Sequence, residues 1–143
     1  MIRSVVRYCR RGYSLPVRDQ WLLVETVLLV VLVRAGLFVA SYPSVRDGLD
    51  VACSVFDGAF TPACPRGRVP WAVERVASAL PGTQSCLVRA LVAETLLVRR
   101  GYPAALRFGV DHSDEEFVAH AWVESGSEVV VGGEVRPAFT RLR

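Results

Sequence analysis

The stretch SCLVRALVAETLLVRRG, from Ser85 to Gly101, decides how this chain folds, because it predicts one buried helix with both ends marked. Ser85 is suited to the N-cap position, and Thr83 is the alternative. Gly101 is placed to cap the other end, and Pro103 prevents the helix from continuing. The residues between the caps are apolar on nearly all sides, which is typical of a central helix rather than a surface helix.

Cys86 stands in the first turn of this predicted helix. A helix N-terminus carries partial positive charge and unpaired N–H groups, which favour a thiolate and can stabilise an oxyanion. The functional interpretation of Cys86 is therefore a nucleophile, and the alternative is a small apolar residue packed at a helix start. The helix alone leaves both interpretations open, because a nucleophile also needs a base.

The pattern changes from helix to strand after this segment. Residues 104–110, 117–125 and 128–134 predict an antiparallel meander of three strands. His120 lies in the middle strand and shares one face of it with Trp122. It is either a core histidine that hydrogen-bonds to the backbone or a general base for the thiol.

A third group usually orients a catalytic imidazole, and the last strand of the meander is expected to supply it. A three-residue turn centred on Gly126 would place Gly132 opposite His120. Glu134 would then lie on the same face as the histidine, one diagonal step away. A shift of one residue in the register would direct Glu134 elsewhere, so this assignment depends on the turn.

The N-terminal third of the chain begins basic and then becomes strongly apolar. Residues 1–20 carry five arginines and one aspartate, and an apolar helix follows over 21–43, where Pro43 is expected to end it. The run is long enough to span a bilayer, but Glu25 and Arg34 interrupt it. A buried helix of a soluble domain is the favoured interpretation, with membrane association and a cleaved signal as the alternatives.

Two further helices are expected between these segments. One is a short helix over 47–56, and the other covers 69–80 with Pro70 in its first turn. Together the segments predict an α+β fold, in which N-terminal helices and the cysteine-bearing helix pack on a small antiparallel sheet. We expect a single domain over 1–143, with a helical part over 1–68 and a catalytic core over 69–143.

The composition excludes several classes of function. The chain has no lysine, which excludes a lysine nucleophile, and its net charge of +3 does not require a nucleic-acid partner. No C-x-x-C pair occurs among Cys9, Cys53, Cys64 and Cys86, so the spacing does not fit a structural zinc site. We expect Cys53 and Cys64 to be structural thiols in a reducing compartment, and we expect no cofactor or metal.

Two segments taken together, SCLVRALVAETLLVRRGYPAALRFGV and FVAHAWVE, resemble the transglutaminase-like cysteine peptidases of lasso peptide biosynthesis. Those proteins remove the leader from the precursor peptide. The combination of C-L-x-R-A…L-L-x-R-x-G with H-A-W-V-E is quite specific, whereas either half alone is weak. The resemblance is strongest over 69–134, and it implies a papain-like or transglutaminase-like core with a Cys-His-acid triad.

The resemblance implies that Cys86 is the nucleophile and that His120 is the base. The acid of the family is generally an aspartate a short way beyond the histidine, but no aspartate follows His120 in this sequence. Glu134 is therefore the candidate acid, with a backbone carbonyl or a water as the alternatives. We also expect the Cys86 N–H and the Gln84 side chain to form an oxyanion hole, and Trp122 and His112 to contact the substrate.

The resemblance also implies partners. A leader-binding domain precedes the peptidase in some members and is a separate protein in others. Because this chain begins almost directly with the apolar helix, we expect a stand-alone peptidase that works with a precursor peptide, a separate leader-recognition protein and a lasso cyclase. We expect a cytoplasmic location, with weak membrane association as the alternative. The rival functions are acyl transfer to an amine and a non-catalytic module that binds a peptide or a membrane-bound partner.

Overall fold

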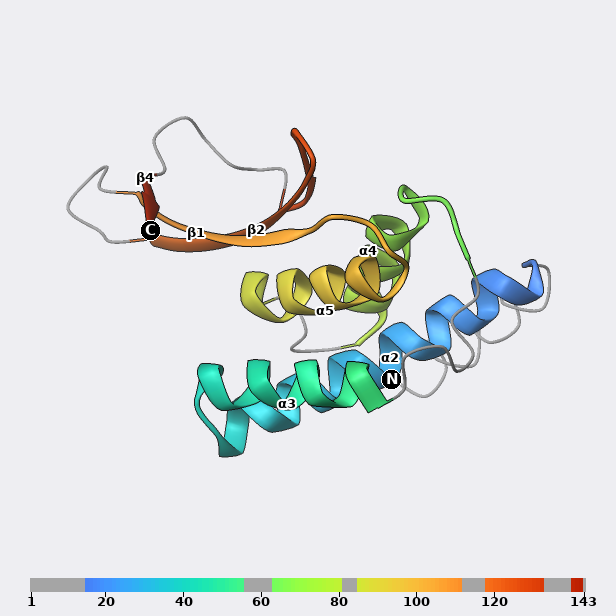
Figure 1. Cartoon of the computed structure of the whole chain (residues 1–143), viewed down its shortest axis with the longest axis horizontal. Coiled ribbons are helices and arrows are strands. Elements are labelled where there is room, and N and C mark those ends of the chain that lie inside the picture. Colours follow the sequence, from blue (N-terminus) through green and yellow to red (C-terminus); the bar gives the residue numbers. More distant parts are fainter. Residues whose placement is uncertain (1–14, 56–62, 81–84, 112–117, 133–139, 143) are drawn as a thin grey trace.

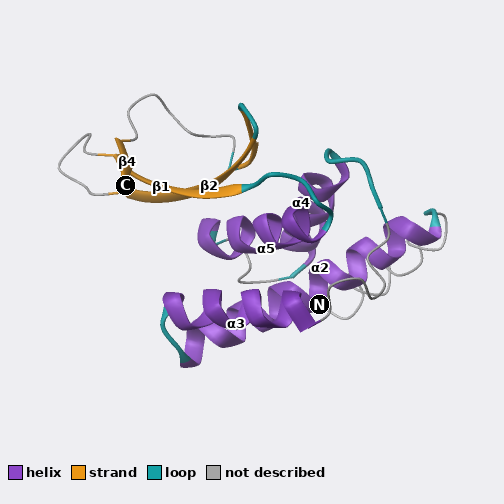
Figure 2. Ribbon diagram, in the orientation of Figure 1, coloured by secondary structure: helices purple, strands orange, loops and turns teal. Residues whose placement is uncertain are grey.

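Helices and one small antiparallel sheet form the computed structural model, which describes residues 15–55, 63–80, 85–111, 118–132 and 140–142. The central helix lies between the sheet on one side and two N-terminal helices on the other (Figures 1 and 2). This arrangement confirms the predicted α+β class, with a central helix that packs directly on the sheet.

The N-terminal apolar segment folds into two helices, α2 (Val17–Val39) and α3 (Tyr42–Val55). The prediction that Pro43 ends the first helix is wrong, because α2 ends at Val39 and Pro43 lies in the first turn of α3. Proline fits a first turn, where its fixed φ suits the helix and its missing N–H has no intrahelical partner to lose. The short helix expected over 47–56 is thus the second part of α3.

The next two helices, α4 (Arg68–Ala79) and α5 (Cys86–Arg99), confirm the predicted ones. The end of α5 is a Schellman motif. Gly101, at a φ of +79°, donates its N–H to the Val98 carbonyl, and Tyr102 donates to the Leu97 carbonyl, both at 3.0 Å. The motif turns the chain sharply, so that only Tyr102–Ala104 separates the cap from the first strand.

The sheet has the strand order β3-β2-β1-β4 and is antiparallel throughout. The meander of β1 (Ala105–Asp111), β2 (Val118–Ser125) and β3 (Glu128–Val131) confirms the prediction. The sequence did not predict β4 (Thr140–Leu142), which pairs with the other edge of β1. A strand of three residues has almost no periodicity of its own, and its pairing is with a distant segment.

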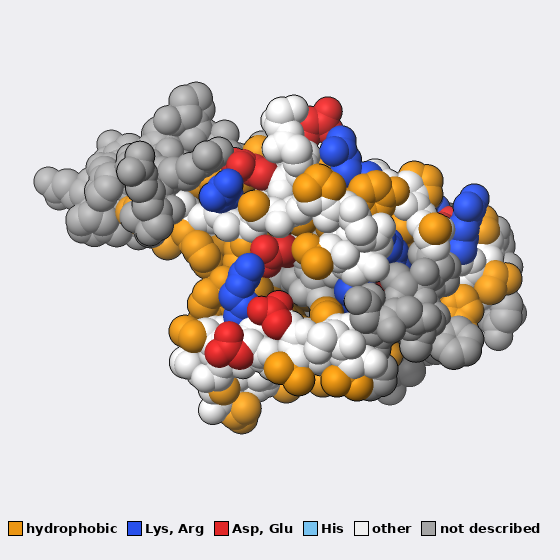
Figure 3. Space-filling model, viewed as in Figure 1, with side chains coloured by type: hydrophobic (Ala, Val, Ile, Leu, Met, Phe, Trp, Pro, Cys, Tyr) orange, Lys and Arg blue, Asp and Glu red, His pale blue; other side chains and the backbone are white. Residues whose placement is uncertain are grey.

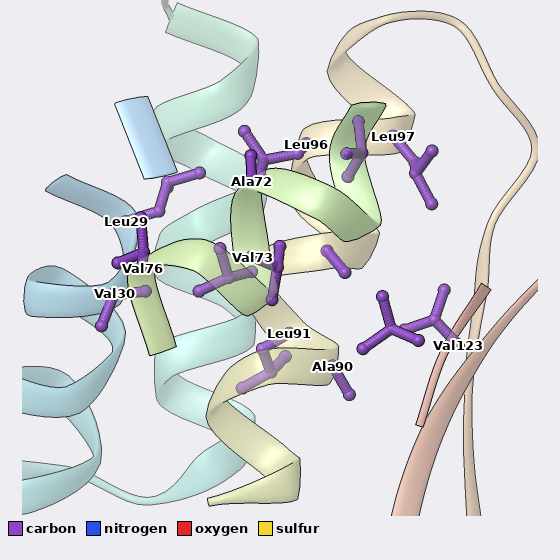
Figure 4. Close-up of a cluster of buried hydrophobic side chains, with 14 of the residues drawn as sticks. Leu29, Val30, Ala72, Val73, Val76, Ala90, Leu91, Leu96, Leu97 and Val123 are labelled. Carbon is purple, nitrogen blue, oxygen red and sulfur yellow. The ribbon is translucent and has the colours of Figure 1, made fainter. Parts of the chain in front are cut away.

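The hydrophobic core is built around α5, as its apolar sequence predicts. Leu91, Leu96 and Leu97 of this helix are almost fully buried. Side chains from α2, α4 and β2 surround them, among them Leu29, Val30, Ala72, Val73, Val76 and Val123 (Figure 4). The helix that carries Cys86 is therefore held on several sides, which fixes the position of its first turn.

Carboxylates fix the neighbouring helices to α5. Glu25 of α2 accepts hydrogen bonds from Arg99 and Arg100, both at 2.6 Å. Glu94, which is buried, accepts two hydrogen bonds from the guanidinium of Arg46 at 3.0 Å and one from the backbone N–H of Leu106 at 3.2 Å. Glu25, which interrupts the apolar run in the sequence, thus joins α2 to the last turn of α5, while Glu94 joins α5 to α3 and β1.

Candidate active site

Cys86 is the first residue of α5, and its side chain is half-buried. Ser85 is the N-cap residue, as predicted, with an extended backbone (φ −61°, ψ 125°), and its carbonyl accepts the N–H of Arg89 at 3.1 Å. The Ser85 side chain makes no capping hydrogen bond. The Ser85 side chain therefore does not bond the N–H groups of the first turn. These groups can donate to other acceptors, such as a developing oxyanion.

The connection after α5 brings the start of β2 to the same end of the molecule as Cys86. At the usual rises per residue, α5 is about 21 Å long and β1 is about 23 Å long, and the Schellman turn sends β1 back along the helix. β1 therefore runs back over α5 and extends past the start of the helix (Figure 1). His120 pairs with Gly109, close to the end of β1.

The two sequence-predicted catalytic residues thus lie on neighbouring elements at one end of the α5–sheet layer. Ala121 and Val123 of β2 belong to the core against α5, so His120 stands on the alternate face of its strand. Within the part of the chain that the structure describes, the Cys86 thiol and the His120 ring form no hydrogen bond with each other. The structure thus brings together the elements that carry the two residues but does not bring the imidazole to the thiol, and a base–nucleophile pair stays a prediction.

The imidazole of His120 has two described neighbours. Its Nε2 lies 3.3 Å from the carbonyl oxygen of Gly132, and its ring stacks on Trp122 with centroids 6.2 Å apart and planes 21° apart. A carbonyl oxygen can only accept, so this hydrogen bond is donated by Nε2–H, and the lone pair of the neutral ring is then on Nδ1. The contact with the carbonyl orients the ring, which is one requirement for a general base.

Trp122 supports this arrangement from a buried position. Its side chain is 3% exposed, and its indole N–H donates to Glu124 at 3.1 Å. Glu124 also accepts a hydrogen bond from Arg107 on β1. The sequence predicted Trp122 as a substrate contact; the structure places it against the histidine ring, and its part in substrate binding stays a prediction.

The register of β2 and β3 differs from the predicted one. The turn has two residues, Gly126 and Ser127, so Ser125 pairs with Glu128, and a β-bulge follows before Val123 pairs with Val131. The predicted pairing of His120 with Gly132 is therefore wrong, because the shorter turn and the bulge shift the register. The Gly132 carbonyl nevertheless reaches the histidine, through a side-chain contact that strand periodicity does not reveal.

Three predicted site residues, Gln84, His112 and Glu134, lie outside the described residues. Their roles as oxyanion donor, substrate contact and triad acid stay predictions. The Gly132 carbonyl is the orienting group that the structure adds. The sequence had offered a backbone carbonyl only as an alternative to Glu134, and the glycine pair at 132 and 133 was the only local signal for a close approach.

The other described cysteines show no comparable setting. Cys53 is half-buried on α3, and Cys64 is buried; neither is in a disulfide. Among the described ranges, no group of three or more histidine, cysteine or acidic side chains is placed to hold a metal ion. A pocket of about 480 Å³ lies between α3 and α5, where Figure 3 shows a hollow rimmed by charged side chains. Its lining comes from residues 46–54 of α3, residues 91–99 of α5 and Ala104, and it does not include Cys86.

Comparison with known protein families gives one match, to the family described as Transglutaminase-like superfamily, over residues 29–143. The chain belongs to the transglutaminase-like superfamily. The matched range includes both Cys86 and His120 as well as the whole sheet. Transglutaminase-like proteins are generally cysteine-dependent enzymes, and they include cysteine peptidases and acyl transferases. Searches of curated proteins and of solved structures gave no significant match.

Proposed function

We propose that this transglutaminase-like protein is a cysteine peptidase that removes the leader from a lasso peptide precursor. The observation that carries the proposal is the position of Cys86 at the N-terminus of a closely packed helix that contacts the strand of His120. Superfamily membership supports a thiol-dependent reaction. The choice of substrate rests on the resemblance of the C-L-x-R-A and H-A-W-V-E segments to lasso leader peptidases.

The proposed reaction transfers the leader acyl group first to sulfur and then to water. His120 removes the proton of the Cys86 thiol, and the sulfur attacks the carbonyl carbon at the leader–core junction. The N–H groups of the first turn of α5, with the Gln84 side chain as a further donor, stabilise the oxyanion. The protonated His120 then gives its proton to the departing amine of the core, which leaves a thioester on Cys86.

Hydrolysis of the thioester completes the cycle. His120 takes a proton from the attacking water, the new C–O bond replaces the C–S bond, and the thiol regains its proton. The products are a leader with a free carboxyl group and a core peptide with a free amine. That amine is the group that a lasso cyclase would use, so we propose the cyclase and a separate leader-recognition protein as partners, in the cytoplasm.

Two groups are proposed to hold the imidazole of His120. The Gly132 carbonyl accepts from Nε2–H, and Glu134 is the candidate acid that would stabilise the imidazolium. A neutral carbonyl orients the ring but stabilises its positive charge less than a carboxylate does. We therefore assign Glu134 a contribution to rate rather than an all-or-none role.

Acyl transfer to an amine is the second candidate function, because the superfamily also includes acyl transferases. Both reactions begin with the same thioester, and only the acceptor differs. The mass of the products separates the two: peptide hydrolysis adds the mass of water, whereas transfer of a glutamine acyl group to an amine releases ammonia.

The decisive experiment is incubation of the purified chain with its precursor, with and without the leader-recognition protein, followed by intact-mass analysis. Cys86→Ala and His120→Ala are expected to abolish leader removal. Cys53→Ala is the matched control, since Cys53 is also half-buried and outside any disulfide but lies on α3, and this variant should remain active. Unchanged leader removal by Cys86→Ala would refute Cys86 as the nucleophile, whereas no leader removal by the wild type together with the leader-recognition protein would favour a non-catalytic binding module.

A further inference from the structure

Helix α2 has two apolar faces, and one of them packs into the core of the described residues. The inner face contributes Leu22, Leu29, Val30 and Val33 to the core. The outer face carries large apolar side chains that stay exposed, and we call them the outer stripe: Val17, Trp21, Val24, Val27, Leu28, Val31, Leu32, Phe38 and Val39. Single exposed apolar residues are normal, but a continuous group on one helix marks an interaction surface.

The outer stripe is continuous along the helix. Residues 17, 21, 24, 28, 31 and 38 follow the spacing of three, four or seven that keeps side chains on one side of a helix. At 1.5 Å per residue the stripe is about 33 Å long. Leu28 is 59% exposed and Leu32 is 62% exposed, so the middle of the stripe is exposed as well as its ends.

The charges around the stripe indicate its occupant. Arg18 and Arg34 are exposed, and at 100° per residue they fall on opposite borders of the stripe. The sequence of residues 1–14 adds four arginines and no acidic residue directly before α2. Trp21, at the start of the stripe, is of the type that favours the boundary between water and lipid. An apolar strip bordered by arginines complements a lipid surface with anionic headgroups.

Because its inner face is packed in the core, α2 is expected to lie flat on such a surface rather than cross a bilayer. By length and composition α2 is the one helix among the described residues that could span a bilayer, but its core side chains pack on α4 and α5. The Glu25 carboxylate is also paired with Arg99 of α5 and with Arg100, the residue that follows this helix. Crossing would break this packing and these ion pairs, whereas flat docking leaves them intact.

We propose that the outer stripe of α2 docks the protein on an anionic lipid surface. Because α5 lies between α2 and the sheet, docking in this way leaves the sheet pointing away from the lipid (Figure 1). His120 therefore remains accessible from the aqueous side. The proposal does not depend on the reaction that the protein catalyses.

The test is co-sedimentation of the full chain with phosphatidylcholine vesicles and with vesicles of phosphatidylcholine mixed with phosphatidylglycerol. We expect binding to the mixed vesicles, weaker binding in high salt, and little binding to phosphatidylcholine alone. The double variant Leu28→Glu/Leu32→Glu is expected to bind at least about tenfold more weakly, because it removes apolar area and adds negative charge. Val129→Glu on β3 is the control, since Val129 is exposed but lies on the sheet.

Two results would overturn the proposal. One is wild-type protein that does not bind the mixed vesicles at any salt concentration. The other is a wild-type dimer in lipid-free solution, measured by light scattering, that the Leu28→Glu/Leu32→Glu variant converts to a monomer; this would assign the stripe to a second copy of the chain. The wild-type comparison between the two vesicle types needs no variant, so the proposal stays testable even if the double variant fails to fold.

Discussion

The Nε2 atom of His120 lies 3.3 Å from the carbonyl oxygen of Gly132, a residue twelve positions further along the chain. Gly132 has a φ of +79°, and a Cβ atom added to it would lie 2.9 Å from the Trp122 Cβ and 3.0 Å from the Ala121 carbonyl oxygen. The carbonyl that orients the histidine therefore depends on a residue without a side chain. The backbone at the end of β3 thus holds the side chain on β2 that we propose as the general base.

Substitution of Gly132 tests this dependence. We expect Gly132→Ala to lower the free energy of unfolding by about 1–3 kcal/mol, because both the positive φ and the short contacts are unfavourable. The displaced carbonyl should also reduce kcat/KM for leader removal by at least about tenfold. Urea unfolding and a mass-based cleavage assay measure the two effects.

Gly101 provides the matched control. It has the same φ of +79°, but a Cβ added there would meet no atom within 4 Å. Gly101→Ala should therefore cost only the backbone strain, about 1 kcal/mol, and leave kcat nearly unchanged. Equal stability and activity of the two variants would show that the contacts around Gly132 do not matter.

Variants of Trp122 can show whether this side chain supports the His120 ring or contacts the substrate. Trp122→Ala is expected to destabilise the fold by about 3–5 kcal/mol, because the side chain is 3% exposed and its removal leaves a cavity. Trp122→Phe keeps a ring beside His120 and loses the hydrogen bond to Glu124 together with part of the buried indole. We expect this variant to lower kcat with little change in KM. A raised KM with an unchanged kcat would instead support the predicted role as a substrate contact.

Glu134 tests how much of the catalysis needs a carboxylate. We expect Glu134→Ala to lose part of the activity, because the Gly132 carbonyl still orients the ring of His120. The rate of leader removal by Glu134→Gln should lie between those of the wild type and Glu134→Ala if residue 134 orients the ring of His120 as well as supplying charge. Rates measured beside His120→Ala give the scale, and full activity of Glu134→Ala would remove this residue from the site.

The Glu94–Arg46 pair predicts a stability effect away from the chemistry. Glu94→Gln should lower the free energy of unfolding by about 1–2 kcal/mol, because the amide cannot accept all three hydrogen bonds that the carboxylate receives. The Arg46 side chain is 39% exposed, so water compensates for part of the loss. Glu74→Gln is the control, since Glu74 pairs with Arg89 near the surface and should change stability by less than about 0.5 kcal/mol.

The same pair predicts the sign of a pH effect. The hydrogen bond to Glu94 raises the pKa of Arg46 above its ordinary value. A group whose pKa is higher in the folded than in the unfolded protein contributes its full stabilisation at any pH below its unfolded-state pKa. That contribution is lost only as the pH rises through the folded-state pKa. Titration of Arg46 should therefore cause no loss of stability across the neutral range. A loss between pH 6 and 9 that Arg46→Gln abolishes would contradict this assignment.

The parts of the fold that depend on local signals were predictable from the sequence. Ser85, Gly101 and the apolar residues between them defined α5, because caps and periodicity are local properties. The first three strands were also predicted, since alternation and a Gly-Ser turn are visible over a few residues. Cys86 could be singled out for the same reason: its position in a helix is readable without knowing the rest of the fold.

The parts that depend on distant contacts were not predictable. The β-bulge in β3 and the pairing of β4 with β1 are set by tertiary packing rather than by their own short sequences. The apolar run from 21 to 43 concealed a break, because the end of α2 and the start of α3 are both apolar. Glu25 seemed to interrupt a helix, and only the fold shows that its partners are Arg99 and Arg100.

The lengths of α5 and β1, joined by Tyr102–Ala104, set the spacing between the thiol and the imidazole. Removal of one turn from α5 would withdraw Cys86 by about 5.4 Å, more than any side-chain rotation at the site would recover. Insertions and deletions should therefore be rare between Cys86 and Asp111 among relatives of this chain. Variation in chain length, and with it in substrate preference, is expected to concentrate outside that segment.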